Sequence, residues 1–98
     1  MYGDSELIQN LDALRTYVHE TICNNNELEE NVFPTTERIL VRRGCPCGIF
    51  FCLHGPRSVK LTAIWETDRN TILFYSSNGE RLHKIHLSGV PSLQPLVA

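Results

Sequence analysis

The sequence predicts an α+β fold in which an N-terminal amphipathic helix packs on a five-stranded antiparallel β-meander. Two patterns predict it. Apolar residues recur at helical spacing between residues 6 and 23, and between residues 37 and 87 five short apolar segments alternate with turns rich in Gly, Pro, Asn and Asp. With 98 residues the chain has room for one modest core. We therefore expect a single domain over residues 1–98, excised from a longer protein.

The apolar stripe of the expected helix consists of Leu7, Leu11, Leu14, Val18 and Ile22, at spacings of four, three, four and four. This spacing places them on one face. Asp4 or Ser5 is positioned to cap the helix start. Beyond the helix, residues 24–36 are rich in Asn and Glu, so we expect an acidic, mobile connector that becomes extended before Pro34.

The expected strands span residues 37–43, 48–54, 59–66, 71–76 and 80–87. Asn78-Gly79 predicts a two-residue type I′ hairpin, because Asn and Gly tolerate the positive φ angles that this turn needs. Counting outward from the turn pairs Ile72 with Ile85, Phe74 with His83 and Tyr75 with Leu82. A turn at Asp68-Arg69 pairs Trp65 with Ile72, so the two hairpins assign the same residues to each face.

One face of the predicted sheet is apolar apart from His83, and we expect the helix stripe to pack on it. This core face comprises Val59, Leu61, Ala63, Trp65, Ile72, Phe74, Ile85 and Leu87. The opposite face is too apolar for an ordinary solvated surface. It gathers Ile64, Leu73, Tyr75 and Leu82, with Lys60, Lys84 and His86 at its rim, and we expect it to bind a partner. The length of the loop in "HGPRSV" leaves open which face residues 49–54 present. Residues 88–98 contain two prolines and no periodicity, which predicts an extended tail.

The net charge of −2 conceals a division along the chain. Residues 1–37 contain eight acids and one base, a net of −7, whereas residues 38–98 contain eight bases and three acids, a net of +5. The two halves are therefore expected to carry opposite electrostatic fields.

The stretch "RGCPCGIFFCLHGPR" could be a metal site, a redox site or a turn. Cys45, Cys47, Cys52 and His54 are ligand types that zinc prefers, but C-x-C is shorter than the usual C-x2-4-C spacing, and a Pro stiffens it further. A redox dithiol favours C-x-x-C at a helix start. We therefore expect Gly44 to Gly48 to form a hairpin turn, all four cysteines to be reduced, and no cofactor to be bound.

Enzyme activity, membrane association and nucleic acid binding are the other functions that the sequence could indicate. It has no recognisable catalytic constellation, so we expect no enzyme activity, and it has no long apolar run or signal peptide, so we expect no membrane association and an intracellular location, cytoplasmic or nuclear. RNA or single-stranded nucleic acid binding is an alternative, because the basic half carries aromatic residues.

These observations favour a protein-interaction module, of the adaptor, scaffold or regulatory kind. The partner would be a peptide or a second copy of the chain, bound by the outer sheet face or by an edge strand. A small zinc-binding domain is a further alternative.

Overall fold

The structure is a computed structural model that describes residues 5–6, 8, 10–89 and 91. These residues form one α-helix, α1 (Leu11–Asn25), and a six-stranded sheet. The strands are β1 (Ser5–Glu6), β2 (Thr35–Arg42), β3 (Cys45–His54), β4 (Lys60–Glu66), β5 (Thr71–Tyr75) and β6 (Arg81–Leu87), and a 3-10 turn, η1 (Pro56–Ser58), joins β3 to β4.

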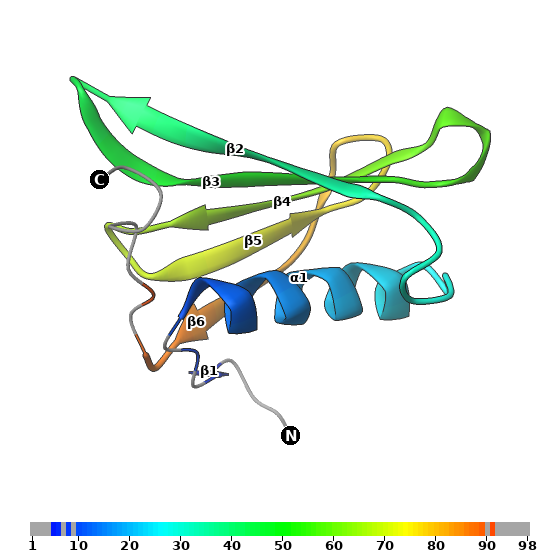
Figure 1. Cartoon of the computed structure of the whole chain (residues 1–98), viewed down its shortest axis with the longest axis horizontal. Helices are drawn as coiled ribbons and strands as arrows, with labels where there is room; N and C mark the ends of the chain where they lie inside the picture. The colour runs from blue at the N-terminus through cyan, green and yellow to red at the C-terminus, as the bar shows by residue number, and fades with distance from the viewer. Residues whose placement is uncertain (1–4, 7, 9, 90, 92–98) are drawn as a thin grey trace.

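The sheet order is β1-β6-β5-β4-β3-β2, so the last five strands form a meander. Each neighbouring pair from β2 to β6 is antiparallel. Helix α1 runs along one face of the sheet (Figure 1). This confirms the predicted fold class. The sequence did not predict β1, which adds two residues in parallel to β6 at the edge opposite β2.

Helix α1 buries Leu11, Leu14, Val18 and Ile22, as its apolar stripe predicted. Leu7, the first member of that stripe, and Asp4 lie outside the described residues. The predicted start was too early, because residues 5 and 6 pair with β6 and Asn10 caps the helix instead. The Asn10 side chain accepts a hydrogen bond from the Ala13 N–H at 2.8 Å, which satisfies one of the free N–H groups of the first turn.

The β4–β5 hairpin has the predicted register, with Trp65 opposite Ile72 and Ile64 opposite Leu73. Asn70 closes its loop at a positive φ of 48°. The Asn70 side chain accepts from the Trp65 indole at 3.1 Å and donates to the Leu87 carbonyl at 3.2 Å. Asn70 therefore ties the buried Trp65 to the end of β6.

The β5–β6 hairpin differs from the prediction near its turn. The Gly79 N–H donates to the Ser76 carbonyl and the Ser76 N–H to the Glu80 carbonyl, so the loop has three residues and only Gly79 has a positive φ. The longer loop pairs Tyr75 with Arg81 rather than with Leu82. A bulge at Leu82 then restores the predicted pairing of Phe74 with His83 and of Ile72 with Ile85.

The β2–β3 hairpin turns earlier than predicted. Arg43 and Gly44, with φ of 53° and 79°, form the two-residue connection, and Cys45 already pairs with Arg42. Positive φ at both central residues is typical of a type I′ turn. The segment from Cys45 to Cys47 therefore belongs to β3, and Cys47 is the extra residue where the register shifts.

The core lies between α1 and the face of the sheet that the sequence predicted. Leu61, Ala63, Trp65, Ile72, Phe74 and Leu87 are buried there, and Val59 and Ile85 pack against them. Strand β3 contributes Ile49, Phe51 and Leu53 to the same face, each no more than 1% exposed. This settles the orientation of residues 49–54: Phe50, Cys52 and His54 lie on the opposite face, which we call the outer face.

Candidate functional site

The outer face is organised in rows that run across the strands. One row reads Arg38, Phe50, Ile64, Leu73, Lys84 from β2 to β6. Its centre is apolar and each end is an exposed cation. The next row reads Thr36, Cys52, Thr62, Tyr75, Arg81. Within the described residues no helix or strand covers these rows.

The predicted surface residues are placed as follows. Ile64, Leu73 and Lys84 share one row and Tyr75 lies in the next, whereas Lys60 and His86 lie near opposite ends of the face. Leu73 is only 9% exposed, so it is more buried than the sequence suggested. Leu82 is 47% exposed at the β6 bulge rather than opposite Tyr75, and its part in the surface stays a prediction.

The charges of the outer face are mostly positive. Among the described residues Arg38, Arg42, Lys60, Arg81 and Lys84 are exposed there, against the carboxylates of Glu66 and of Asp68, which pairs with Arg42 at 3.5 Å. The Arg38 guanidinium lies 5.4 Å from the centre of the Phe50 ring, a cation–π arrangement. The acidic helix lies on the other face of the sheet, so these cations and the helix acids lie on opposite sides of the sheet.

The candidate zinc ligands do not converge. Cys45, Cys47, Cys52 and His54 are all on β3, whose rise of about 3.3 Å per residue separates its ends by roughly 30 Å. Cys45 is exposed and Cys52 is buried, and His54 contacts the Thr36 hydroxyl at 3.0 Å. Among the described residues no three His, Cys, Asp or Glu side chains are grouped to hold a metal ion.

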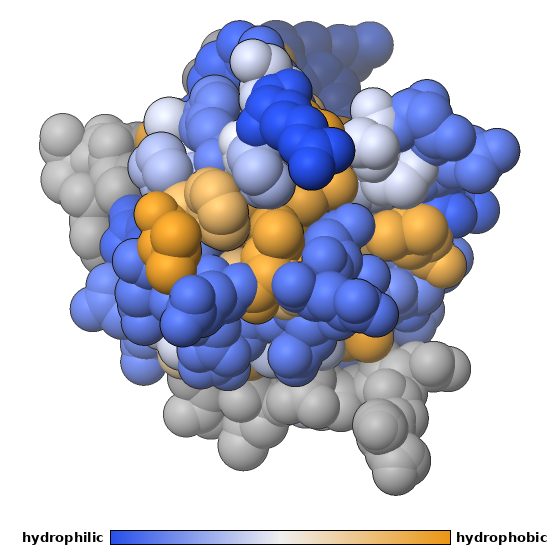
Figure 2. Space-filling view, turned by 90° about the vertical axis from the view of Figure 1, so that its right-hand side faces the viewer, coloured by the Kyte–Doolittle hydropathy of each residue, from blue (hydrophilic) through white to orange (hydrophobic). Residues whose placement is uncertain are grey.

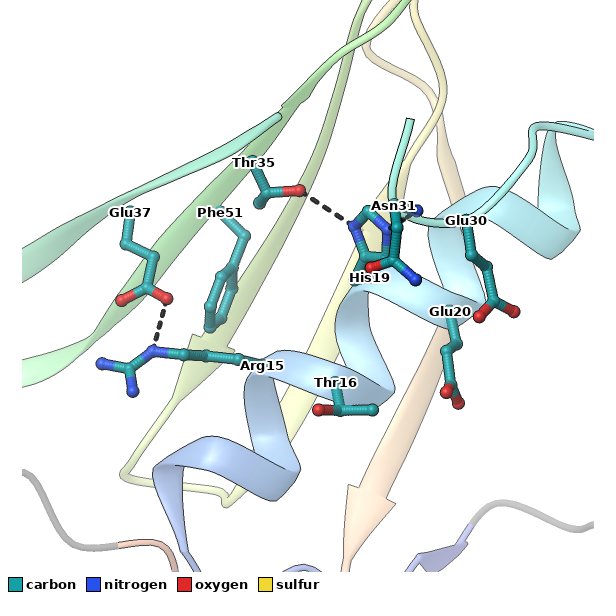
Figure 3. Close-up of a pocket in the computed structure, with 9 residues that line it drawn as sticks. All are labelled: Arg15, Thr16, His19, Glu20, Glu30, Asn31, Thr35, Glu37 and Phe51. Carbon is teal, nitrogen blue, oxygen red and sulfur yellow. Dashed lines mark hydrogen bonds and ion pairs between the residues drawn. The ribbon is translucent and has the colours of Figure 1, made fainter. Parts of the chain in front are cut away.

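A groove that the sequence did not predict lies between α1 and β2. It has a volume of about 350 Å³ and is lined by Arg15, Thr16, His19, Glu20, Glu30, Asn31, Thr35, Glu37 and Phe51. Two contacts cross it: Arg15 Nε donates to a Glu37 carboxylate oxygen at 2.6 Å, and His19 Nδ1 lies 3.1 Å from Thr35 Oγ1. The Phe51 ring lies between these two contacts (Figure 3). The hydrogen bond to Glu37 raises the pKa of Arg15.

The hydrogen bonds of His19 assign its tautomer. Its Nε2 accepts the Asn31 N–H at 3.1 Å and therefore carries no proton, so Nδ1 bears the hydrogen and donates it to Thr35. His19 thus links the helix, the connector and β2. The spacing of Arg15 and His19 beside the apolar stripe, four residues apart, was the sequence signal that could have indicated these contacts.

Cys23 and His19 approach each other, with Sγ 3.7 Å from Nε2. This resembles a nucleophile and its base, but Cys23 is only 1% exposed. Burial, with a smaller contribution from the Glu30 carboxylate, raises the pKa of the Cys23 thiol. A reactive cysteine needs a lowered pKa and access to solvent, so this pair is better suited to packing than to catalysis.

Comparisons with protein families, with curated proteins and with solved structures found no match to this chain. No helix in the described part of the chain is long and apolar enough to cross a membrane. Hydrophobic surface is scattered in separate spots between hydrophilic groups at the end of the molecule that carries η1 and the end of α1 (Figure 2). The outer face and the groove are therefore the candidate sites of this domain.

Proposed function

We propose that this domain is an intracellular protein-interaction module, of the cytoplasm or nucleus, whose outer face binds an acidic partner segment with apolar side chains. The observation that carries the proposal is the row from Arg38 to Lys84, which has Phe50, Ile64 and Leu73 between two cations. An apolar centre with a charged rim is the usual anatomy of a protein interface.

A second copy of the chain is a less suitable partner for this face. Five cations and two carboxylates, Glu66 and Asp68, give the described part of the outer face a net charge of +3, so two such faces would repel each other. A partner with carboxylates beside leucine, isoleucine or phenylalanine would instead match both the rim and the centre. This favours an adaptor or regulatory role over self-assembly.

Single-stranded nucleic acid is the second candidate, because Tyr75 and Phe50 lie half-buried among cations and the acidic helix is on the far face. Two observations weigh against it. Arg38 already covers the Phe50 ring, and the chain as a whole carries a net charge of −2, whereas nucleic-acid-binding domains are usually strongly basic.

Selection from a random peptide library, followed by fluorescence anisotropy of the enriched peptides, tests the proposal. The enriched peptides should combine Asp or Glu with large apolar residues. Replacing both end cations, Arg38→Glu with Lys84→Glu, should weaken binding about tenfold or more, because two rim charges are reversed. Arg69→Glu, in the β4–β5 loop, is the matched control and should bind as the parent does.

Two outcomes of this experiment contradict the proposal. One is a set of selected peptides without acidic residues that bind the charge-reversed variant as tightly as the parent. The other is tighter binding of a twelve-nucleotide oligo(U) or oligo(dT) than of any selected peptide, which would favour the nucleic acid candidate.

A further inference from the structure

Strand β2 offers an open edge to a further strand. It is the last strand of the sheet order, and within the described residues it pairs only with β3. The His54 N–H donates to the Pro34 carbonyl at 2.9 Å, which makes residues 34 and 54 a hydrogen-bonded pair. Hydrogen-bonded and non-hydrogen-bonded pairs alternate along an antiparallel ladder. The backbone N–H and C=O groups of Thr36 and Arg38 therefore point toward β3. Those of Thr35, Glu37 and Ile39 point outward, away from the sheet.

The groove lies along this open edge. Thr35 and Glu37 line it from β2, and Thr16 and Glu20, one helical turn apart, line it from α1 (Figure 3). A strand added to β2 would lie about 4.8 Å further out, with alternate side chains directed to each face. Every second side chain of that strand would therefore enter the groove.

The charges of the groove determine which side chains of an added strand it can bind. Glu20 and Glu30 line it, and neither side chain has a hydrogen bond or a cationic partner among the described residues. Helix α1 has no basic residue in its last turn, so nothing there offsets the partial negative charge of the helix end. Arg15 is the one cation among the described residues that line the groove, and it is already bonded to Glu37 and Asp12.

We infer that the β2 edge and this groove bind an extended peptide segment as a further strand, with a Lys or Arg side chain beside Glu20 and Glu30. The backbone of the segment bonds Thr35, Glu37 and Ile39, and the groove selects its side chains. This site lies at the sheet edge and on the helix side, so it is independent of the outer-face binding proposed above.

The test uses the full chain labelled with nitrogen-15 and a heptapeptide of alternating Thr and Val with Lys at the centre. Titration should shift the amide signals of Thr35, Glu37 and Ile39 and slow their hydrogen exchange. The same peptide with Glu in place of Lys should bind about tenfold more weakly, because both groove carboxylates then repel it. Methylating the peptide nitrogens that face β2 should abolish binding, and methylating those that face away should not.

Variants of the protein separate the charge effect from folding. Glu20→Gln with Glu30→Gln should remove most of the preference for Lys over Glu, whereas Glu29→Gln, in the same connector but outside the groove, should keep it. Ile64→Lys on the outer face should leave this binding unchanged. Equal binding of the Lys and Glu peptides, insensitivity to nitrogen methylation, or no shift at millimolar peptide would each overturn the inference.

Discussion

At the scale of single residues, the sequence indicated that Gly48 must be a glycine, but it indicated the wrong structural reason. The sequence indicated a turn glycine, yet Gly48 is buried in β3 opposite Glu66. A Cβ atom built on it would lie 2.1 Å from the Trp65 carbonyl oxygen, far inside contact distance. Glycine is needed there because another backbone passes close by, which no local sequence pattern reveals.

Gly48→Ala should therefore destabilise the domain by about 2–3 kcal/mol, because two backbones must separate to admit the methyl group. Urea denaturation measures this. Gly55→Ala is the matched control, since its nearest neighbour would be the Val59 carbonyl oxygen at an ordinary 3.6 Å. Equal stability of the two variants would contradict the close approach at Gly48.

His83 is the polar residue of the predicted core face, and it stacks on Phe74 with ring centres 4.7 Å apart. Burial lowers its pKa in the folded state. At a pH above the ordinary histidine pKa of about 6.5, the His83 imidazole is neutral in both the folded and the unfolded chain. As the pH falls below that value the unfolded chain binds a proton that the folded chain still excludes, so stability decreases toward the lowered folded pKa.

His83→Phe keeps the stacking and removes this titration. The loss of stability between pH 7.5 and pH 5.5, followed by urea midpoints, should be smaller in this variant than in the parent. His86→Phe, at an exposed position of the same strand, serves as the control. A pH dependence that is the same in the His83 variant and the parent would refute the assignment.

At the scale of elements, patterns that repeat along the chain predicted more than single turns did. The four-three-four-four stripe placed α1 on the correct face, and two hairpins together assigned the faces of β4, β5 and β6. The β5–β6 pairing agreed with the prediction because two departures cancel: a loop longer by one residue and a bulge at Leu82. Alternation of apolar residues fixes which face is buried, but it does not reveal a loop and a bulge that compensate each other.

Gly79 carries the conformation that this loop requires, with φ of 90°. Gly79→Val should destabilise the domain by roughly 1–3 kcal/mol, because a β-branched residue is strained at positive φ. Gly79→Asn should cost much less, since Asn tolerates that region. Thermal denaturation of both variants tests the loop, and a Val variant that melts with the parent would show that Gly79 does not need this backbone conformation.

At the scale of the whole molecule, the acidic and basic residues that are separated along the sequence are separated in the fold between the two faces of the sheet. Most acids of the first third lie on α1 and the connector, on one side of the sheet, and five cations of the basic remainder project from the other. The sequence showed that the charges are separated along the chain but not on which face they lie, because only the sheet register decides which strand residues face away from the helix. The groove was missed for the same reason: its walls come from segments that are distant in sequence.

The proposed function requires the outer face to be a surface for a partner and not a second buried core layer. The alternative is that the C-terminal segment with Leu93 and Leu96 covers this face within one chain; that segment lies outside the described residues. Ile64 and Tyr75 provide the test, because both are half-buried on the outer face and next to fully buried core-face residues such as Ala63.

The most direct measurement is therefore a circular-dichroism melt of Ile64→Lys combined with Tyr75→Glu, beside the control Ala63→Lys. The outer-face variant is expected to keep its spectrum and to melt within a few degrees of the parent, while it no longer binds the selected acidic peptides. Ala63→Lys is expected to unfold, because it buries a charge. If the outer-face variant unfolds as the control does, the outer face belongs to the core and the proposed function is wrong.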